Sequence, residues 1–577
     1  MAASQETLSQ SERDRRVLEL HEKLLEIEER LIPTGLHVFG RVSQAQEKID
    51  MLRMIASFDR PEAGAQALPD LVAEAFKFPR VSARGAVNEE ILAQRQAVNA
   101  VVSEALRTFL EKGSDAAISQ LQGENVGEED SRPIFNLLEK IVAQLGTNQE
   151  IDALSRALRG EYIQPGPGAD IVQNPSILPT GRNTHAINPY SVPSVTAFTR
   201  AEPVTTALLT RYRADHGRFP RAMALVLWGL DNIKTQGEGV AQALWLLGVR
   251  PLRDRLNRVT AVEPILLEEL NRPRIDVLLT VSGIFRDLFS PTVQLLDKAV
   301  RLVAQLNEPD ELNYVRAHVQ QQMREESCAQ DDAAVRVFSN APGNYGTNVN
   351  FMVMDSQWAK DETLGDLFVT RKCFAYGRDS SGSTIEGREA RSAMDRALSR
   401  VEATYQNIDT IEIGITDVDH YFEYLGGISK AVEHRARARP AIYLSDTLTR
   451  DAKIRTLEET VRLETRAKTL NPKWYEGMLK HGFRGVAEIE NHLSNTFGWS
   501  ATADAVDDWI YSEVARTFVL DEQMLKRLRT LNPHSAHSLI GRLLEAHGRG
   551  YWDAEQDVID RLRDIVGDLE DQFEGIA

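Results

Sequence analysis

The most concentrated group of chemically active side chains lies within the segment TDVDHYFEYLGG. Three carboxylates and one imidazole, those of Asp417, Asp419, Glu423 and His420, fall within seven residues. These oxygen ligands could hold a hard divalent cation, and the histidine could pass protons near neutral pH. The alternative is a solvated loop at a helix start, with Asp417 as N-cap and the other acids favoured by the helix dipole. Spacing alone favours this second interpretation.

A second group of charged residues, Arg455, Glu459, Arg462 and Arg466, recurs at helical spacing. Arginines on one helix face could receive the carboxylates of an acidic ligand. The alternative is an exposed helix face whose i,i+4 ion pairs contribute about 0.2–0.5 kcal/mol each. The spacing by itself favours the exposed face.

Aromatic residues surround two helix breaks in the segment NPKWYEGMLKHGFRG. Trp474, Tyr475 and His481 would suit the wall of a cleft, on which a large flat ligand could stack. Ordinary core packing explains the same pattern, with His481 capping a helix carbonyl. Two glycine-rich turns, at 236–239 and 342–348, would let the backbone approach a ligand closely, or are simple tight turns.

Several common kinds of catalytic site are absent from the sequence. There is no G-x-x-x-x-G-K-[ST] segment, so the chain is not expected to hydrolyse ATP by the P-loop route. HExxH, CxxC and GxSxG segments are missing as well. The two cysteines, Cys328 and Cys373, cannot build a disulfide framework or a multi-thiolate zinc site. Standard hydrolase and dehydrogenase functions therefore have no support.

Composition excludes further classes of protein. The 577 residues carry 67 Lys and Arg against 85 Asp and Glu, a formal charge of −18, and no basic footprint for nucleic acid stands out. Hydrophobic residues at 42% and charged residues at 26% are typical of globular chains. The sequence has no apolar run of about 18 residues, so no integral membrane segment is expected, and its first residues lack the apolar core of a signal peptide. We expect a soluble protein in a reducing compartment, the cytoplasm.

The side chains of the 417–423 cluster need a scaffold, and the sequence predicts an α/β fold. Short apolar runs at 223–230, 274–283, 410–417 and 441–446 alternate with helical patterns. Such alternation favours a mostly parallel sheet covered by helices on both faces. Because ligands bind beyond the carboxyl ends of strands in such folds, the cluster is expected just past a strand end.

The sheet core is flanked by helical N- and C-terminal regions. An apolar stripe over residues 17–31 and similar patterns over 88–112 and 133–158 predict helices. A Pro-, Gly-, Asn- and Ser-rich segment then predicts a long loop, and helical periodicity returns towards the C-terminus. The predicted regions are a helical region at 1–160, a loop-rich connector at 161–200, an α/β domain at 201–450 and a C-terminal helical domain at 451–577.

Long words of the sequence together resemble a known family. GEYIQPGPGADIVQNPSILPTGRN, WGLDNIKTQGEGVAQALWLLGVRP, NRPRIDVLLTVSGIFRDLF, ITDVDHYFEYLGG and LNPKWYEGMLKHGFRGVAEIENHLSNTFGWSATADAVDDWIY are similar to the porphyrin-binding large (H) subunits of magnesium chelatases. The cobalt-inserting large subunits of cobalamin synthesis belong to the same superfamily. The similarity runs in order from about residue 12 to the C-terminus, and NTFGWSATADAVDDWIY and LLEAHGRGYW resemble the magnesium branch more.

The resemblance implies a reaction. The family inserts Mg²⁺ into protoporphyrin IX in chlorophyll and bacteriochlorophyll biosynthesis for photosynthesis. Partner subunits complete the complex: an AAA+ ATPase that hydrolyses the ATP and a subunit with an integrin-like domain. Under this resemblance Asp417, Asp419 and Glu423 are the expected Mg²⁺ escorts, because Mg²⁺ prefers oxygen ligands, and His420 is the expected base for the pyrrole N–H protons.

The macrocycle itself is flat and apolar with two propionates, so it requires an apolar slot with cations at one edge. The residues that the resemblance assigns to it are Arg455, Arg466 and Lys473 for the propionates and Trp474, His481 and Trp499 for the ring wall.

One departure from the family concerns length. The family's large subunits are roughly twice as long, and this chain resembles their C-terminal half only. The His-Gly…Glu-Trp-Leu-Pro-Gly segment of the family's first half is not found. The chain is therefore expected to be a fragment, one piece of a split subunit that works with a separate N-terminal half, or a shortened paralogue. Alternatives for its function are a cobaltochelatase large subunit and a non-catalytic porphyrin-binding or scaffold fragment.

Overall fold

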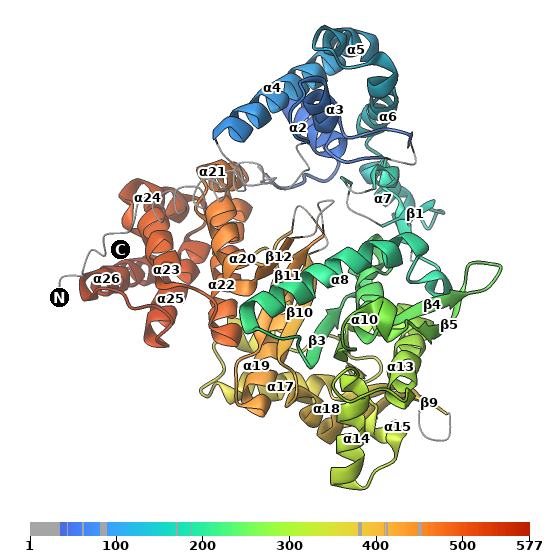
Figure 1. Ribbon diagram of the computed structural model, residues 1–577. Helices are drawn as coiled ribbons and strands as arrows, with labels where there is room; N and C mark the ends of the chain where they lie inside the picture. Colours follow the sequence, from blue (N-terminus) through green and yellow to red (C-terminus); the bar gives the residue numbers. More distant parts are fainter. Residues whose placement is uncertain are drawn as a thin grey trace, which may run out of the picture. The chain divides into compact units, whose positions relative to one another are not determined.

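The computed structural model describes most of the chain in two compact units (Figure 1). One unit comprises residues 1–32 and 37–185, and the other comprises residues 33–36 and 186–577. The helix predicted over 17–31 lies outside the described residues. The structure describes residues 35–42, 44–60, 63–80, 89–168, 171–172, 174–185, 187–378, 383–408, 410, 413–447 and 453–576.

The first unit is a bundle of helices around an apolar core. The helical patterns predicted over 88–112 and 133–158 are confirmed, the second as two helices separated at 146–149. In the predicted loop-rich connector at 161–200, the described residues form short elements up to Ser191, and helix α8 (Val195–His216) begins inside its predicted bounds. The helices of this unit are α2 (Ala45–Ala56), α3 (Leu68–Ala75), α4 (Glu89–Lys112), α5 (Ser114–Gly123), α6 (Glu128–Leu145) and α7 (Glu150–Leu158), and its other elements are β1 (Pro165–Pro167), η2 (Pro175–Ile177) and β2 (Asn183–His185).

The second unit is built on an eight-stranded, mostly parallel sheet, which confirms the predicted α/β class. Its strand order is β12-β11-β10-β3-β6-β7-β8-β9. Strands β11, β10, β3, β6 and β7 pair in parallel, whereas β12, β8 and β9 pair antiparallel. The strands are β3 (Ala222–Leu227), β6 (Asp276–Val281), β7 (Val337–Ser339), β8 (Phe374–Arg378), β9 (Thr384–Glu389), β10 (Ala403–Ile408), β11 (Ala441–Asp446) and β12 (Lys453–Thr456).

The order of the parallel strands reverses between β3 and β10. From β3 the chain continues to β6 and β7 on one side, and later returns to β10 and β11 on the other side. At such a reversal the connections leave in opposite directions, which opens a crevice outside the carboxyl ends of the two strands. The segments that follow β3, β7 and β10 therefore lie together at the carboxyl end of the sheet.

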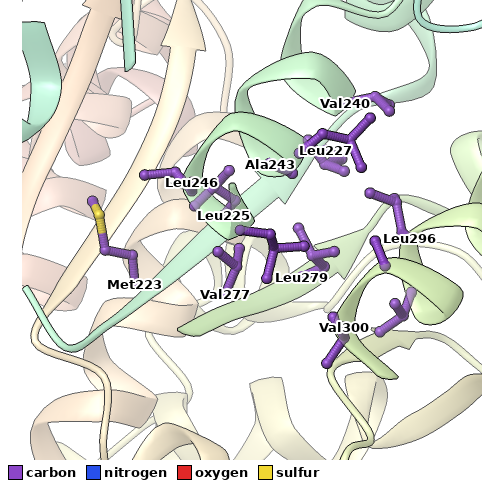
Figure 2. Packing of buried hydrophobic residues seen from close by; sticks show 14 of the residues in the cluster. Met223, Leu225, Leu227, Val240, Ala243, Leu246, Val277, Leu279, Leu296 and Val300 are labelled. Atoms are coloured by element: carbon purple, nitrogen blue, oxygen red, sulfur yellow. The ribbon is translucent and has the colours of Figure 1, made fainter. Parts of the chain in front are cut away.

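Helices cover both faces of the sheet. Figure 2 shows Leu225 and Leu227 of β3 and Leu279 of β6 packed against side chains of α10 (Glu238–Leu247) and α13 (Ser290–Gln305). Helix α8 (Val195–His216) crosses the strands on the same side (Figure 1). On the opposite face, Thr404 of β10 hydrogen-bonds Ser429 of α19 (Gly427–Ala436) at 2.7 Å, and α17 (Glu362–Lys372) packs on α19.

The prediction of strands at 223–230, 274–283 and 441–446 is confirmed by β3, β6 and β11. The prediction of a strand at 410–417 is wrong for its described residues, and the buried strand is β10, which lies earlier. Alternating isoleucines imitate a strand there, but the N–H groups of Ile415 and Thr416 donate to the Glu464 carboxylate, both at 3.0 Å, instead of to a neighbouring strand.

The C-terminal region is helical as predicted, except for β12. Its helices belong to the same compact unit as the sheet. No helix in the described ranges is both long and apolar enough to cross a membrane. These helices are α20 (Leu457–Glu464), the π-helical turn η5 (Thr465–Thr469), α21 (Pro472–Leu479), α22 (Phe483–Ala503), α23 (Asp508–Ala515), η6 (Arg516–Leu520), α24 (Glu522–Leu531), α25 (Pro533–Gly548) and α26 (Gln556–Glu574).

Shorter elements connect the strands. They are η3 (Pro189–Ser191), α9 (Gly229–Lys234), β4 (Val249–Arg253), β5 (Val259–Pro264), α11 (Leu267–Leu270), α12 (Gly283–Leu288), α14 (Tyr314–Glu326), α15 (Gln330–Ala333), α16 (Val349–Met354), α18 (Arg391–Leu398) and the π-helical turn η4 (Phe422–Gly426).

Candidate active site at the carboxyl edge of the sheet

A histidine and a buried carboxylate form the centre of the site. His420 Nδ1 lies 3.0 Å from Glu423 Oε2. The π-helical turn η4 carries Glu423 inward, so only 2% of its side chain is exposed, while 62% of the His420 side chain is exposed. π-helical turns are rare and occur frequently at functional sites. The structure thus pairs two members of the 417–423 cluster in the segment that follows β10, beside the switch point of the sheet.

The 342–348 turn holds the other oxygen of this carboxylate. Glu423 Oε1 accepts hydrogen bonds from Thr347 N, from Thr347 Oγ1 at 3.1 Å and from Asn348 N at 3.1 Å. Gly346 has φ +66°, and a Cβ there would lie 3.1 Å from Glu423 Oε1. Gly346 thus lets the backbone of the turn approach the Glu423 carboxylate. The glycine-rich sequence of the turn predicts such a close approach, but to a ligand. Burial opposes the charge, but the hydrogen bonds from His420 and Thr347 outweigh it and lower the pKa of Glu423.

The neighbouring carboxylate defines which nitrogen of His420 is free. The hydrogen bond to Glu423 raises the pKa of His420, against a smaller opposing effect of burial. An ionised acceptor at Nδ1 places the proton of the neutral imidazole on Nδ1 and leaves the Nε2 lone pair available. Asp419 Oδ1 lies 3.5 Å from the same Nδ1, and the ring of Trp228 lies 6.0 Å away between centroids. The arrangement suits a base that accepts a proton on Nε2.

Asp419 is the most accessible carboxylate beside His420. About a third of its side chain, 34%, is exposed, and its Oδ2 accepts a hydrogen bond from Asn350 Nδ2 at 2.6 Å. The Oδ1 atom of Asn350 is buried and has no hydrogen-bond partner in the described structure. A carboxylate and an amide oxygen are ligands that Mg²⁺ accepts. Asp419 and Asn350 are thus the oxygen donors placed next to the candidate base.

Asp417, by contrast, is held in an internal ion-pair network. Its Oδ1 lies 2.8 Å from His492 Nε2, and its Oδ2 pairs with Lys468 Nζ. Burial opposes ionisation, but His492 and Lys468 outweigh it and lower the pKa of Asp417 well below its ordinary range. Both partners lie far along the chain, so no local motif could have identified them. The network fastens the loop before η4 to the C-terminal helices.

The three predicted metal-binding carboxylates therefore do not form one cluster. The Asp417 carboxylate pairs with Lys468 and His492, and both oxygens of the Glu423 carboxylate also have hydrogen-bond partners. Within the described ranges no three His, Cys, Asp or Glu side chains converge as a metal-binding group. The assignment of all three carboxylates as Mg²⁺ escorts stays a prediction, and the geometry supports Asp419 best.

Of the three aromatic residues predicted for the ring wall, Trp474 and Trp499 are buried and His481 is half-buried. Trp474 is buried against His492, with 4.3 Å between ring centroids. Trp499 is fully buried and donates from Nε1 to Ile415 O at 2.9 Å. His481 Nε2 accepts the N–H of Leu36 at 3.0 Å. These contacts give the three side chains packing functions, and their contact with a macrocycle stays a prediction.

The predicted cations are distributed over separate elements. The prediction that Arg455 shares a helix face with Arg466 is wrong. Arg455 lies in strand β12 and pairs with Asp446 at 3.3 Å. The guanidinium of Arg466 stacks 4.2 Å above the Trp509 ring, and Lys473 is exposed at the start of α21. Of the other members of that group, Glu459 pairs with Arg211 at 3.0 Å and Arg462 pairs with Asp507. A role for Arg455, Arg466 and Lys473 towards propionates stays a prediction.

The structure reveals an apolar rim that sequence reasoning missed. Trp228, directly after β3, contacts Tyr424 with 4.3 Å between ring centroids and the ring planes tilted by 49°. Its buried Nε1 has no hydrogen-bond partner in the described structure. Exposed apolar side chains follow the carboxyl ends of β3, β6, β7 and β10. These residues, here called the apolar rim, are Leu230, Ile284, Tyr345, Phe351 and Ile413. Leu230, Ile284 and Phe351 lie in the short helices α9, α12 and α16, and Tyr345 and Ile413 lie outside helices and strands. They are far apart in the sequence, so only the sheet topology could reveal them.

Comparison with known proteins identifies the family. The chain matches the CobN/Magnesium Chelatase family over residues 2–559. The chain belongs to this family. It is 42% identical over 600 residues to the chloroplastic magnesium-chelatase subunit ChlH of Oryza sativa subsp. japonica, which covers 99% of this chain and 43% of that protein. It is 43% identical over 439 residues to the magnesium-chelatase H subunit of Cereibacter sphaeroides. That alignment covers 76% of this chain and 36% of that protein.

A solved structure of a family member supports the fold. The catalytic subunit of cobaltochelatase from Mycobacterium tuberculosis superimposes with a TM-score of 0.90 and is 34% identical. The superposition covers 98% of this chain and 47% of that chain. The chain thus spans less than half the length of these three family members.

Proposed function

We propose that this chain is the porphyrin-binding, metal-inserting part of a magnesium chelatase large subunit and inserts Mg²⁺ into protoporphyrin IX. The two relatives named as magnesium chelatase subunits, at 42% and 43% identity, support magnesium as the metal. Because the chain spans under half of each, we propose that it acts with an ATP-hydrolysing AAA+ subunit, a subunit with an integrin-like domain and a separately supplied N-terminal half. The observation that carries the proposal is the His420–Glu423 pair at the switch point of the sheet.

In the proposed reaction His420 removes the pyrrole protons. Neutral His420 accepts a proton on Nε2, the N–H bond breaks, and its electron pair stays on the pyrrole nitrogen to bind the metal. Glu423 remains ionised and stabilises the imidazolium that forms, 3.0 Å away. Because most of the His420 side chain is exposed, it passes this proton to water before it takes the second one. Two protons thus leave for each Mg²⁺ inserted, and charge balances.

Asp419 and Asn350 are proposed to deliver the metal. Mg²⁺ releases its water shell reluctantly, so oxygen donors beside the ring nitrogens must replace water ligands one at a time. The Asp419 carboxylate supplies charge, and the Asn350 amide oxygen is already oriented by its hydrogen bond from Nδ2 to Asp419. Asp417 is proposed to fix the loop that carries Asp419 through its pairs with Lys468 and His492.

The apolar rim is proposed to receive the macrocycle. The five exposed apolar side chains of the rim follow strands that end at the same side of the sheet as the segment of His420, and a flat apolar ligand requires an apolar lining. Burial of a few hundred Å² of ring surface at about 25 cal/mol per Å² would supply several kcal/mol of binding free energy. Porphyrin affinity is therefore expected to survive the loss of any single cation.

A cobaltochelatase acting on a corrin precursor is the second candidate function. Its specific support is the superposition on the catalytic subunit of a cobaltochelatase over nearly the whole chain. The metal and macrocycle used in an assay distinguish the two functions. Insertion of Co²⁺ into a corrin precursor, without Mg²⁺ insertion into protoporphyrin IX, would select the second.

The proposal is tested by separating binding from insertion. We expect saturable quenching of tryptophan fluorescence when deuteroporphyrin is added, and Mg²⁺ insertion when the partner subunits and an N-terminal half are supplied with ATP. The His420→Ala protein is expected to retain porphyrin affinity and to lose insertion. His216→Ala changes an exposed histidine at the end of α8 and serves as the control. Absence of saturable quenching, or full insertion by His420→Ala, would refute the proposal.

A further inference from the structure

A buried lysine lies behind the candidate active site without contacting solvent. Lys372, the last residue of α17, is fully buried in the described structure. Its Nζ donates to Val281 O at 3.0 Å and to Asn340 Oδ1 at 2.9 Å, and it lies 4.2 Å from the centroid of the Tyr424 ring. A buried ammonium group is costly unless it is paired, so its retention requires a reason beyond packing.

One route of contacts leads from Lys372 to the base by hydrogen bonds. Because Lys372 occupies Oδ1 of Asn340, the Nδ2 group of that amide must face the other way, where it donates to Gly346 O at 2.6 Å. The next two residues of the turn, Thr347 and Asn348, present their N–H groups to Glu423 Oε1. Glu423 in turn accepts His420 Nδ1.

A second route runs through aromatic rings. The Tyr424 ring that covers Lys372 Nζ contacts the tilted ring of Trp228, with 4.3 Å between centroids, and the Trp228 ring lies 6.0 Å from that of His420. Burial lowers the pKa of Lys372 to about 7, and the Glu423 carboxylate is the main influence that opposes this shift. The Lys372 ammonium group and the Glu423 carboxylate therefore interact electrostatically, although no direct hydrogen bond joins them among the described contacts.

We propose that Lys372 is a positioning residue for the candidate active site: through Asn340 and the 346–348 turn it fixes Glu423, and thereby the Nδ1–H tautomer and the direction of His420. The inference rests on the proposed function only where it concerns metal insertion. The tautomer of His420 can be measured without any reaction, so failure of one claim is distinguishable from failure of the other.

The test compares two buried lysines. Lys372→Met removes the donor to Asn340 but keeps an unbranched apolar chain. Lys430→Met is the matched control, because Lys430 is also buried and pairs at 2.9 Å with Glu433 on α19, outside the contacts described above. The tautomer is read from ¹⁵N chemical shifts of histidine-labelled protein, with the His420 signal assigned by its absence in His420→Ala.

We expect Lys372→Met to shift His420 from the Nδ1–H form towards the Nε2–H form. In the reconstituted reaction kcat for insertion is expected to fall about 10- to 100-fold, as for loss of other residues that orient a reacting group, with little change in KM for porphyrin. Lys430→Met is expected to leave both the tautomer and kcat as in the unaltered chain. A folded Lys372→Met protein with an unchanged His420 tautomer overturns the proposal, whatever its activity.

A second variant covers the case in which Lys372→Met does not fold. Asn340→Asp has the same shape and keeps an acceptor for Lys372, but it replaces the Nδ2 donor that holds Gly346 O. The same change of His420 tautomer is expected in Asn340→Asp. An unchanged tautomer in this variant shows that the route through the turn does not orient His420, and it likewise overturns the proposal.

Discussion

The Nδ1 atom of His420 lies 3.0 Å from a Glu423 carboxylate that is itself held by two backbone N–H groups. One partner is largely exposed and the other is almost fully buried. The buried partner orients the exposed one and stabilises its charged form, so the pair should act as a unit. Substitution of His420 therefore removes the base itself, whereas substitution of Glu423 tests its orientation and charge stabilisation.

Replacing Glu423 by glutamine tests this relationship. Glu423→Gln preserves the shape of the side chain but removes the charge that stabilises protonated His420. We expect insertion to fall about 10- to 100-fold at saturating porphyrin, while porphyrin affinity measured by fluorescence quenching changes little. The control is Glu402→Gln. Glu402 is a partly exposed carboxylate that pairs with Arg218 at the amino end of the sheet. An equal loss of insertion in both variants would show that the effect is general destabilisation.

The same variant predicts a shift in pH dependence. Glu423 raises the pKa of His420 above its ordinary value of 6.5, and only the neutral imidazole can accept a proton. Insertion by the unaltered chain is therefore expected to rise with pH through a midpoint above 6.5, and this midpoint is expected to move to lower pH in Glu423→Gln. A midpoint that stays in place would separate Glu423 from the titration of His420. The measurement is the rate of Mg²⁺ insertion between pH 5 and 9 at about constant ionic strength.

Two glycines of the 342–348 turn form a matched pair for a second prediction. Gly346 and Gly343 both have positive φ, at +66° and +76°, so alanine strains either position by about 1–2 kcal/mol. A Cβ at Gly346 would lie 3.1 Å from Glu423 Oε1, whereas one at Gly343 meets nothing within 4 Å. Both Ala variants are expected to lose similar stability in urea unfolding, but only Gly346→Ala is expected to lose insertion. Equal insertion by the two variants would mean that the turn does not position Glu423.

The sequence predicted those features that are local. Strands β3, β6 and β11 each contain at least three consecutive apolar residues, whereas β10 contains no such run and carries Gln406 and Asn407. The isoleucine alternation after it was mistaken for the strand, because a side-chain pattern does not reveal where backbone N–H groups find their acceptors. The α/β class was thus predictable, and the position of one site-bearing strand was not.

The candidate site divides in the same way. His420 and Glu423 are three residues apart, so their pairing follows from local spacing. Thr347 lies more than 70 residues earlier, and only the parallel arrangement of β7 and β10 in one sheet brings it to Glu423. Trp474 and Trp499 illustrate the reverse error, because an aromatic cluster at helix breaks is compatible both with a ligand wall and with a buried core.

The ion-pair network of Asp417 predicts a change in acid stability. A carboxyl group whose folded pKa is depressed stabilises the fold above its unfolded value of 3.8, and this contribution is lost as pH falls through the folded pKa. Asp417→Asn removes the carboxylate that pairs with both Lys468 and His492, so we expect about 3–5 kcal/mol lower free energy of unfolding at pH 7. The difference from the unaltered chain is expected to shrink below about pH 4 in urea titrations. A difference that is constant from pH 7 to pH 3 would contradict the electrostatic explanation.

Substitution of Trp499 distinguishes packing from ligand contact. Trp499→Phe retains a buried ring but removes the Nε1 donor to Ile415 O, which leaves a buried carbonyl without that partner. We expect a loss of about 1–3 kcal/mol in the free energy of unfolding, measured by urea denaturation, because an unsatisfied buried polar group carries its desolvation cost. Deuteroporphyrin affinity is expected to remain unchanged, since the side chain is fully buried. Tyr345→Ala, on the apolar rim, is expected to show the opposite pattern, with weaker porphyrin binding and nearly unchanged stability. If instead Trp499→Phe weakened porphyrin binding at unchanged stability, the ring wall would lie where the sequence alone placed it, among the C-terminal helices.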